Sequence, residues 1–244
     1  MPLRIFIADL HLRADMPQGL ALFADFLQHF GTDSELYVLG DLFDLWLGDD
    51  LDLPRYASVT EALGAYAKRG GRTLLMVGNH DFLLGEGFFS ASGALPLADP
   101  YLLEHAGRRL LLTHGDALCT ADVDYQAFRA RIRAPAFVAE FLAMPAERRQ
   151  AMASEFQEGS RSATAQKDAT VMQVDAVAAD AALRDSGADI LLHGHTHRPG
   201  VHRLPMGRRV VLGPWHGRES ALVWPPGEPP RMINMDCDAA ELGA

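Results

Sequence analysis

Apolar segments that stop abruptly at polar residues recur along this chain. In five places a short run of leucine and β-branched residues is followed at once by Asp, Asn or His. The five clusters are Asp9-Leu10-His11, Gly40-Asp41-Leu42-Phe43-Asp44, Gly78-Asn79-His80-Asp81, Thr113-His114-Gly115-Asp116 and His193-Gly194-His195-Thr196-His197. Continuous apolar runs of this length beside glycine are typical of strands buried on both faces. We therefore predict strands over residues 3–8, 36–39, 73–77, 109–112 and 190–192.

Helical patterns lie between these predicted strands. Residues 19–30 place leucine and phenylalanine on one helical stripe, and residues 59–69 have a similar period. Alternation of strand and helix predicts an α/β sandwich with functional groups at the carboxyl ends of the strands. Residues 201–204, 210–212 and 221–224 are predicted to be shorter, antiparallel strands between glycine and proline turns.

The stretch from about residue 122 to residue 182 breaks this rhythm and is rich in Ala, Arg and Glu. Pro135 and Pro145 stand where helices can start. Apolar residues recur near helical spacing at Phe128, Ile132, Phe137, Phe141, Leu142 and Met144. We predict that residues 122–166 form a helical insertion over the strand ends and that a core helix follows it. Residues 1–244 then form one domain that carries this insertion.

Composition and charge limit the classes of protein. The formal net charge of −10 argues against a surface built to bind nucleic acid, because such a surface must be basic. Cys119 and Cys237 are too few for a disulfide framework and suit a reducing cytosol. The apolar start of the chain is too short for a signal peptide, and no segment approaches the roughly 20 apolar residues of a membrane-spanning helix. We expect a soluble protein, or one that is peripheral to a membrane.

The charge is unevenly distributed. Residues 129–167 contain seven basic and four acidic residues, so this stretch carries +3 while the remainder carries −13. A basic, apolar helical insertion fits an anionic amphiphile or a phospholipid surface. Arginine on a solvated helix face is an equally good explanation, because arginine favours helices.

The five clusters supply oxygen and nitrogen donors and no thiolate. The donors are Asp9, His11, Asp41, Asn79, His114, His195 and His197. This set suits Mn²⁺, Fe or Zn²⁺ and disfavours a structural zinc site of the cysteine type. In Asp9-x-His11 and His195-x-His197, an i, i+2 pair in extended chain points to one side, so each pair can bind a metal ion.

A carboxylate such as Asp41 can bridge two metal ions about 3.5–4 Å apart. Two ions would bind phosphate oxygens and lower the pKa of a water, so that no protein nucleophile is needed. Each cluster alone has an ordinary structural explanation, since a strand-end Asp is often a helix cap and a His on an apolar strand is often a core residue. All five together, each after a buried strand, predict a two-metal phosphoesterase.

The five clusters resemble the DxH, GDxxD, GNHD, HG and GHxH pattern of the calcineurin-like metallophosphoesterases. The resemblance implies a four-layer αββα sandwich. It also implies that Asp9, His11, Asp41 and His197 bind one metal ion, and that Asp41, Asn79, His114 and His195 bind the other. Expected catalytic residues are Asp41, His114 and His80, the last as a general acid or electrostatic stabiliser with Asp81 as its orienting partner. Asp44 and Asp116 are expected to be supporting or turn residues.

A closer resemblance covers nearly the whole chain, through segments such as Trp46-Leu47-Gly48-Asp49-Asp50 and Val211-Leu212-Gly213-Pro214-Trp215-His216. It is to a subfamily of lipid A synthesis that uses Mn²⁺ to cleave UDP-2,3-diacylglucosamine into UMP and 2,3-diacylglucosamine 1-phosphate (lipid X). The resemblance implies a peripheral protein on the cytoplasmic face of the inner membrane, and we expect a monomer. Its helical insertion would shelter the acyl chains. The substrate contacts implied are Asn79, His80, Asp122, Ser160, Thr164, Lys167 and His195.

The chain departs from this subfamily at three positions. His80 stands where the subfamily usually has Arg, and Gln157 and Thr164 stand where it usually has Arg and Asn. Loss of two guanidinium groups removes bidentate phosphate contacts, for which Arg161 and Lys167 are possible substitutes. The alternative function is therefore a related dimetal phosphodiesterase or pyrophosphatase with another nucleotide or phosphodiester substrate. A non-catalytic scaffold is disfavoured because every expected ligand position is occupied, and a nuclease is disfavoured by the negative charge.

Overall fold

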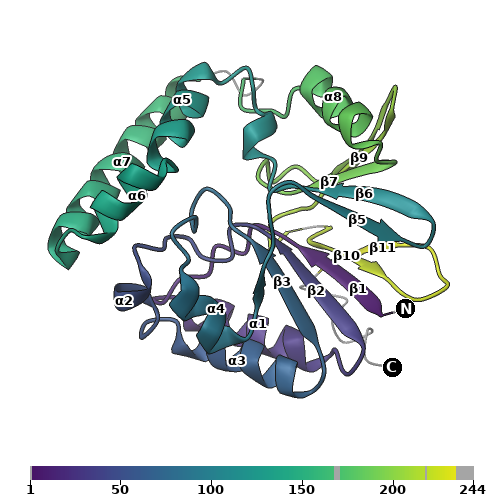
Figure 1. Ribbon diagram of the computed structural model, residues 1–244, viewed down its shortest axis with the longest axis horizontal. Coiled ribbons are helices and arrows are strands. Elements are labelled where there is room, and N and C mark those ends of the chain that lie inside the picture. The colour runs from purple at the N-terminus through teal and green to yellow at the C-terminus, as the bar shows by residue number, and fades with distance from the viewer. Residues whose placement is uncertain (1, 168–170, 218, 235–244) are drawn as a thin grey trace.

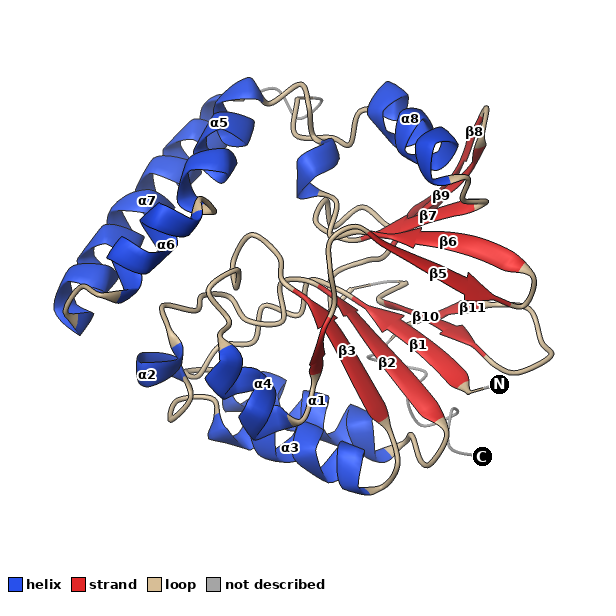
Figure 2. Ribbon diagram, in the orientation of Figure 1, coloured by secondary structure: helices blue, strands red, loops and turns tan. Residues whose placement is uncertain are grey.

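The protein is built on two β-sheets that pack face to face (Figures 1 and 2). Its structure, a computed structural model, describes residues 2–167, 171–217 and 219–234, without the side chains of residues 161–166. The first sheet has the order β11-β10-β1-β2-β3-β4 and the second β5-β6-β7-β9-β8. In the first sheet β1 to β4 are parallel, while β10 and β11 are antiparallel to their neighbours.

The strands end where the sequence clusters begin. Strands of the first sheet are β1 (Leu3–Ile7), β2 (Ser34–Leu39), β3 (Arg72–Met76), β4 (Leu95–Pro96), β10 (Ala221–Trp224) and β11 (Arg231–Ile233). Those of the second sheet are β5 (Tyr101–His105), β6 (Arg108–Leu112), β7 (Ile190–His193), β8 (Gly200–Leu204) and β9 (Gly207–Val211). All five strands predicted before the polar clusters are present.

Side-chain alternation along the strands creates the layers. Ile5 and Ile7 of β1 lie in the core between the first sheet and its helices, whereas Phe6 lies in the core between the two sheets. In β6, Leu110 faces the inter-sheet core and Leu111 faces a third core on the outside of the second sheet. Alternate residues of a strand point to opposite faces, so each central strand supplies two cores. The layers are helix, sheet, sheet and helix, which confirms the predicted four-layer sandwich.

Helices cover the outer faces of both sheets (Figure 2). Helices α1 (Pro17–Gln28), α3 (Ala57–Lys68) and α4 (Glu86–Ser92) cover the first sheet, α2 (Asp49–Asp52) is a single turn, and α8 (Ala176–Ser186) covers the second. Trp215 is fully buried against Phe23 and Phe26 of α1, with ring centroids 6.0 and 5.1 Å apart. These contacts pack α1 against the segment of Trp215, whose backbone N–H donates to the carbonyl of Asp9 at 3.3 Å.

Three helices occupy the predicted insertion, namely α5 (Val123–Ile132), α6 (Pro135–Leu142) and α7 (Ala146–Gln166). They form an arm beside the ends of the strands (Figure 1). Pro135 is at the start of α6, as predicted, and Phe141 of α6 and Ala153 of α7 are buried in the first core. The arm, called the helical insertion below, therefore packs on the main body through part of its apolar surface.

Two sequence expectations about strands need correction. Strand β9 is parallel to β7 and antiparallel only to β8, whereas all three late strands were predicted to be antiparallel. Strand β5 (Tyr-Leu-Leu-Glu-His) was not predicted, because only its first three residues are apolar, and the burial of its residues alternates at the edge of the sheet. Among the described residues, no helix has the length and apolar character needed to span a bilayer.

Candidate metal centre and active site

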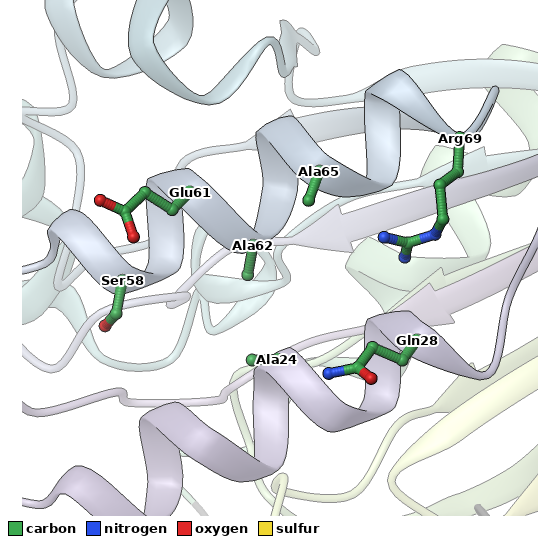
Figure 3. Close-up of a pocket in the computed structure, with 7 residues that line it drawn as sticks. All are labelled: Ala24, Gln28, Ser58, Glu61, Ala62, Ala65 and Arg69. Carbon is green, nitrogen blue, oxygen red and sulfur yellow. The ribbon is translucent and has the colours of Figure 1, made fainter.

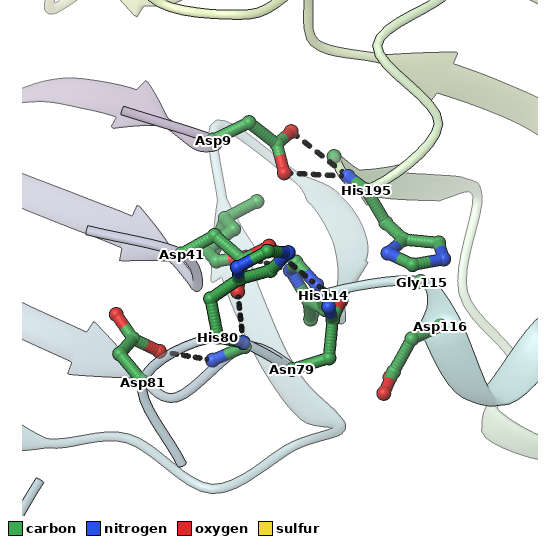
Figure 4. Close-up of polar contacts among 12 residues, drawn as sticks. Asp9, Asp41, Asn79, His80, Asp81, His114, Gly115, Asp116 and His195 are labelled. Atoms are coloured by element: carbon green, nitrogen blue, oxygen red, sulfur yellow. Dashed lines mark hydrogen bonds and ion pairs between the residues drawn. The ribbon is translucent and has the colours of Figure 1, made fainter. Parts of the chain in front are cut away.

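The predicted ligands converge where strands of both sheets end. Asp9, Asp41 and Asn79 follow β1, β2 and β3 of the first sheet, while His114 and His195 follow β6 and β7 of the second. Figure 4 shows these side chains directed into one region between the strand ends. Parallel neighbouring strands end at one edge, and two stacked sheets bring two such edges together. The site therefore needs residues from both sheets.

Left-handed backbone shapes the ligand loops. Asp9, His11, Asp41, His195 and His197 all have positive φ angles, between 45° and 64°. Such angles are uncommon outside glycine and cluster at functional sites. The sequence interpretation assumed extended chain for the two i, i+2 pairs, and this was wrong. Asp9 and His11 do fall in one group of donors, whereas His195 and His197 fall in two different groups, so the second pair does not bind a single ion as expected.

One group of donors comprises Asp9, His11 and His197. Their ligand atoms all lie within 4.8 Å of one another. The Nε2 atoms of His11 and His197 are 3.2 Å apart, and Nε2 of His197 lies 3.5 Å from Oδ1 of Asp9. The backbone N–H of His195 donates to both oxygens of Asp9, at 3.0 and 2.8 Å, and so orients that carboxylate. Two imidazoles and a carboxylate suit a first divalent metal ion.

A second group comprises Asp41, His114 and His195, whose ligand atoms also lie within 4.8 Å. Nε2 of His114 is 2.9 Å from Oδ1 of Asn79 and 3.5 Å from Oδ2 of Asp41. Oδ2 of Asp41 is also 3.8 Å from Nε2 of His11 in the first group. Asp41 therefore lies between the two groups, where a bridging carboxylate must lie.

Hydrogen bonding leaves the His114 ring ready to bind a cation through Nε2. Its Nδ1 donates to the backbone carbonyl of Leu39 at 2.9 Å, which leaves Nε2 directed at Asp41 and Asn79. Burial alone would lower the pKa of His114, but the carboxylates of Asp41, Asp9 and Asp116 raise it to about 9. A buried cluster of carboxylates thus attracts positive charge to this point, which fits divalent metal ions.

Two glycines allow the loops to approach each other closely. A Cβ at Gly78 would collide with the Asp41 carboxylate, and a Cβ at Gly194 would collide with Asp9. Each glycine immediately precedes a predicted ligand, Asn79 or His195. Glycine at positions 78 and 194 therefore lets the backbone before Asn79 and His195 pass close to the carboxylates of Asp41 and Asp9.

His80 lies at the same centre but is oriented differently from the sequence expectation. Its Nδ1 donates to the backbone carbonyl of Asp44 at 2.8 Å, and its ring stands edge to face on His11 with centroids 4.7 Å apart. Asp81 does not orient His80. The Asp81 carboxylate accepts backbone N–H groups of Leu42 and Gly78, both at 2.7 Å, and so holds two ligand loops together. Burial and the nearby Asp41 raise the pKa of Asp81 to about 6.

The predicted substrate contacts outside the metal centre are distributed along the helical insertion. Nζ of Lys167 lies 2.5 Å from Oδ1 of Asp122, and the same oxygen accepts the backbone N–H of Tyr125 and so caps α5. Ser160 is exposed on α7. The side chain of Thr164 lies outside the described residues. Asp122 and Lys167 are thus brought together, and Asn79, His80 and His195 are at the metal centre.

The basic residues of the insertion mostly pair with acids of the protein itself. Arg129 and Arg133 contact Asp116, Arg149 contacts Asp50, and Lys167 contacts Asp122. Arg131 lies over the rings of Phe128 and Phe156, at 5.7 and 5.9 Å. Most basic residues of the insertion therefore form ion pairs within the protein, and those of Arg129, Arg133 and Arg149 stabilise its packing on the main body.

Sequence reasoning understated Asp116 and missed Arg149. Asp116 is fully buried and accepts three hydrogen bonds from the insertion, and Arg149 is 3% exposed and donates to the carbonyl of Leu47 at 2.8 Å. Burial would raise the pKa of Asp116, but His114, Arg129 and Arg133 hold it well below its usual range. The arginines of the insertion were visible in the sequence. Their acidic partners are distant along the chain, and a single sequence does not show which arginine pairs with which acid.

A separate pocket lies between α1 and α3, on the outer helix layer (Figure 3). It is lined by small side chains such as Ala24, Ala62 and Ala65, together with Glu61 and Arg69. None of the candidate metal ligands lines this pocket, so it is distinct from the centre described above.

Comparison with known proteins shows the family of this chain. A family model for calcineurin-like phosphoesterases matches residues 4–199, and the chain belongs to this family of metal-dependent hydrolases. Proteins named UDP-2,3-diacylglucosamine hydrolase from Aeromonas salmonicida and Escherichia coli are each 42% identical to this chain. The matches cover 92% and 98% of this chain and 90% and 97% of theirs, so the chain belongs with these hydrolases. The solved phosphoesterase YfcE from E. coli is 19% identical, with a TM-score of 0.45 over 96% of this chain and 93% of that one.

Proposed function

We propose that the protein hydrolyses the pyrophosphate bond of UDP-2,3-diacylglucosamine to UMP and 2,3-diacylglucosamine 1-phosphate, a step of lipid A synthesis. The observation that supports this most is a cluster of metal-binding donors beside an apolar helical insertion, in a chain 42% identical to hydrolases named for this substrate. A long-chain glycolipid needs an apolar surface next to the reacting phosphate, and the helical insertion offers one.

In this proposal Asp9, His11, Asp41 and His197 hold one metal ion, and Asp41, Asn79, His114 and His195 hold the other. Mn²⁺ is the proposed ion for both, because the donor set mixes imidazole nitrogens with carboxylate and amide oxygens. When bound, the ions polarise the phosphate oxygens and make water nucleophilic at neutral pH. The water oxygen bonds to the phosphorus on the UMP side, and the bond to the phosphate of lipid X breaks.

His80 is proposed to act on the leaving phosphate. Its Nδ1–H is engaged by the carbonyl of Asp44, so Nε2 is the atom free to interact with substrate. The ring packs against His11 and its backbone N–H donates to Oδ1 of Asp41 at 2.9 Å. When the ring carries a proton on both nitrogens, Nε2 can donate a proton or a hydrogen bond to the phosphate as it departs.

The apolar face of the insertion is proposed to contact the acyl chains, and its polar residues the sugar and phosphate. Phe137, Val138 and Met152 are only partly buried against the main body and so leave apolar surface for a ligand. Asp122, Ser160, Thr164 and Lys167 supply the polar contacts in this proposal. Lys167 would then exchange part of its ion pair with Asp122 for the substrate phosphate.

The experiment that tests the function is mass spectrometry of the products from purified protein, Mn²⁺ and UDP-2,3-diacylglucosamine. UDP-N-acetylglucosamine serves as the matched control without long acyl chains. UMP and lipid X from the acylated substrate alone are expected. Turnover of a simple aryl phosphodiester without cleavage of the lipid would instead favour the alternative, a related dimetal phosphodiesterase with another substrate, and His80 would be the first residue to exchange for Arg.

We also propose that the protein acts as a monomer at the cytoplasmic face of the inner membrane. The membrane contact is supported by the proposed substrate, whose acyl chains lie in the bilayer. Each buried CH₂ group of an acyl chain adds about 0.8 kcal/mol to the free energy of membrane partitioning. Flotation with vesicles of phosphatidylethanolamine and phosphatidylglycerol tests the contact. A protein that stays entirely in the lower fraction would rule out stable membrane association.

A further inference from the structure

The carboxylate of Asp116 joins the helical insertion to the main body. Asp116 follows β6 two residues after His114 and is fully buried. Its Oδ2 accepts from Oη of Tyr125 at 2.9 Å, from Nε of Arg129 at 2.7 Å and from Nη2 of Arg133 at 3.3 Å. All three donors belong to α5 or the residue that follows it, so one buried oxygen holds this end of the insertion.

The same donors reach two of the loops that carry candidate ligands. Nη2 of Arg133 also donates to the carbonyl of Gly78 at 2.7 Å, immediately before Asn79. The ring of Tyr125 stacks on the ring of His195, with centroids 6.1 Å apart and planes at 28°. Together with the position of Asp116 beside His114, α5 thus contacts the segments that present Asn79, His114 and His195.

These three residues are the non-bridging ligands of one proposed metal ion. We propose that Asp116 is a positioning residue that couples the docking of α5 to the geometry of this ion's ligands, through Tyr125 and Arg133. The inference rests on the proposed dimetal site. It assigns to the insertion a second task besides contact with substrate, because the metal centre would be complete only when α5 is docked.

The physical consequence is reciprocal. If docking of α5 favours metal binding, metal binding must favour docking of α5 by the same free energy. Removal of groups that orient metal ligands typically lowers metal affinity or activity by about 10–100-fold. An effect of this size is expected from Asp116 although it is not itself one of the proposed ligands.

The first test is Asp116→Asn in the full chain. Mn²⁺ affinity measured by calorimetry should fall about 10-fold or more, and kcat on bis(p-nitrophenyl) phosphate, which has no acyl chain, should fall with it. Hydrogen exchange of α5 provides a readout without turnover. Mn²⁺ should slow exchange in Val123–Ile132 of the wild type and slow it much less in Asp116→Asn.

Arg133→Gln is the second variant, because Asp116→Asn also changes the charge beside His114 and could fail to fold. It leaves the Asp116 carboxylate in place and removes the contacts of Arg133 with that carboxylate and with the Gly78 carbonyl. As in Asp116→Asn, the Mn²⁺ affinity of Arg133→Gln should fall. Mn²⁺ should also slow hydrogen exchange of α5 less than in the wild type. Wild-type values for both variants in both measurements would overturn the proposal.

Asp50→Asn is the matched control. Asp50 accepts a hydrogen bond of 2.9 Å from Nη1 of Arg149 in α7 and so anchors a part of the insertion other than α5. We expect the Mn²⁺ affinity and aryl-ester kcat of Asp50→Asn to stay within about 2-fold of wild type, an energy difference small beside ordinary single-mutation effects. A loss as large as that of Asp116→Asn would show general loosening in place of positioning.

The outcomes also separate this inference from the proposed function. Wild-type protein that binds no Mn²⁺ would defeat the dimetal site itself. Wild-type protein that binds Mn²⁺ and cleaves the aryl ester but not UDP-2,3-diacylglucosamine would defeat only the substrate, and the comparison of Asp116→Asn with Asp50→Asn would remain decisive.

Discussion

At the scale of single residues, the metal centre depends on side chains held by unusual backbone. Five of the seven proposed ligands have left-handed φ angles. All seven ligand residues are buried or half-buried except His197, which is exposed. Ligand types and loop positions were predictable from the sequence, since they follow strand ends. The left-handed geometry was not, because it arises from contacts such as the His195 N–H on Asp9, which join residues far apart in the chain.

His114→Ala is expected to abolish turnover and leave the fold intact. Removal of the imidazole eliminates the Nε2 that faces Asp41 and Asn79, while the neighbouring strands keep their apolar contacts. We expect kcat to fall at least about 100-fold, the upper end for loss of groups that merely orient ligands. Calorimetry and circular dichroism measure metal occupancy and fold, with His29→Ala on the exposed end of α1 as control. Normal kinetics with full metal occupancy would contradict the role assigned to His114.

His193 makes a separate prediction about pH. It is fully buried, its Nδ1 donates to the carbonyl of Gly194 at 2.8 Å, and burial together with nearby Arg209 lowers its pKa to about 3. A histidine whose pKa is lower in the folded than in the unfolded chain stabilises the fold above the unfolded pKa of about 6.5. Its contribution is progressively lost as the pH falls from there toward 3.

The measurement is urea unfolding of metal-free wild type and His193→Leu at pH 7 and pH 5. Between these values the wild type should lose roughly 1 kcal/mol per pH unit more than the variant, the slope for one extra proton bound by the unfolded chain. Other titrating groups occur in both proteins and cancel in the comparison. Equal pH slopes would show that His193 is not held neutral in the fold.

At the scale of secondary structure, the sequence predicted elements best where burial is strongest. The strands before the five clusters, α1, α3 and the helices of the insertion were all expected, because their apolar periods are long and consistent. Strand β5 and the single turn α2 were missed, since an edge strand and a four-residue helix leave little periodic signal. Pairing of β9 with β7 depends on a long-range register that local pattern does not contain.

Helix α8 offers a test of local stabilisation. Asp175 caps its start, with Oδ1 accepting the backbone N–H groups of Val177 and Ala178 at 2.7 and 3.3 Å. Asp175→Ala leaves these donors without the carboxylate and should reduce the free energy of unfolding by about 1 kcal/mol. Denaturant unfolding measures the change. Asp185→Ala, on the exposed end of the same helix, should alter it by less than about 0.5 kcal/mol, and equal effects would remove the capping role.

At the scale of the whole molecule, the proposed metal ions join the two sheets. Ligands from β1, β2 and β3 meet ligands from β6 and β7, so bound metal should stabilise the packing between the sheets. Mn²⁺ at about 100 times its dissociation constant stabilises a folded protein by about 2.7 kcal/mol when the unfolded chain does not bind it. EDTA should therefore lower the unfolding temperature of the wild type by several degrees.

The control for this effect is His114→Ala, in which one contribution from the second sheet is removed. Differential scanning fluorimetry with Mn²⁺ or EDTA should give a much smaller difference between the two conditions for this variant. An unchanged unfolding temperature in the wild type would show that metal binding is not linked to the folded state.

The pairing of a late strand, β10, with the first strand, β1, has a consequence for the protein during its synthesis. Strands β10 and β11 are the last described strands, yet β10 pairs with β1, and Asp9 after β1 lies next to His197. A ribosome makes the chain from the N-terminus, so β1 is without its antiparallel neighbour until more than 200 further residues, up to Ala221–Trp224, have been made. The growing polypeptide therefore lacks a finished active centre until His197 has been made and a finished first sheet until β10 and β11 have been made, so catalysis cannot begin before then.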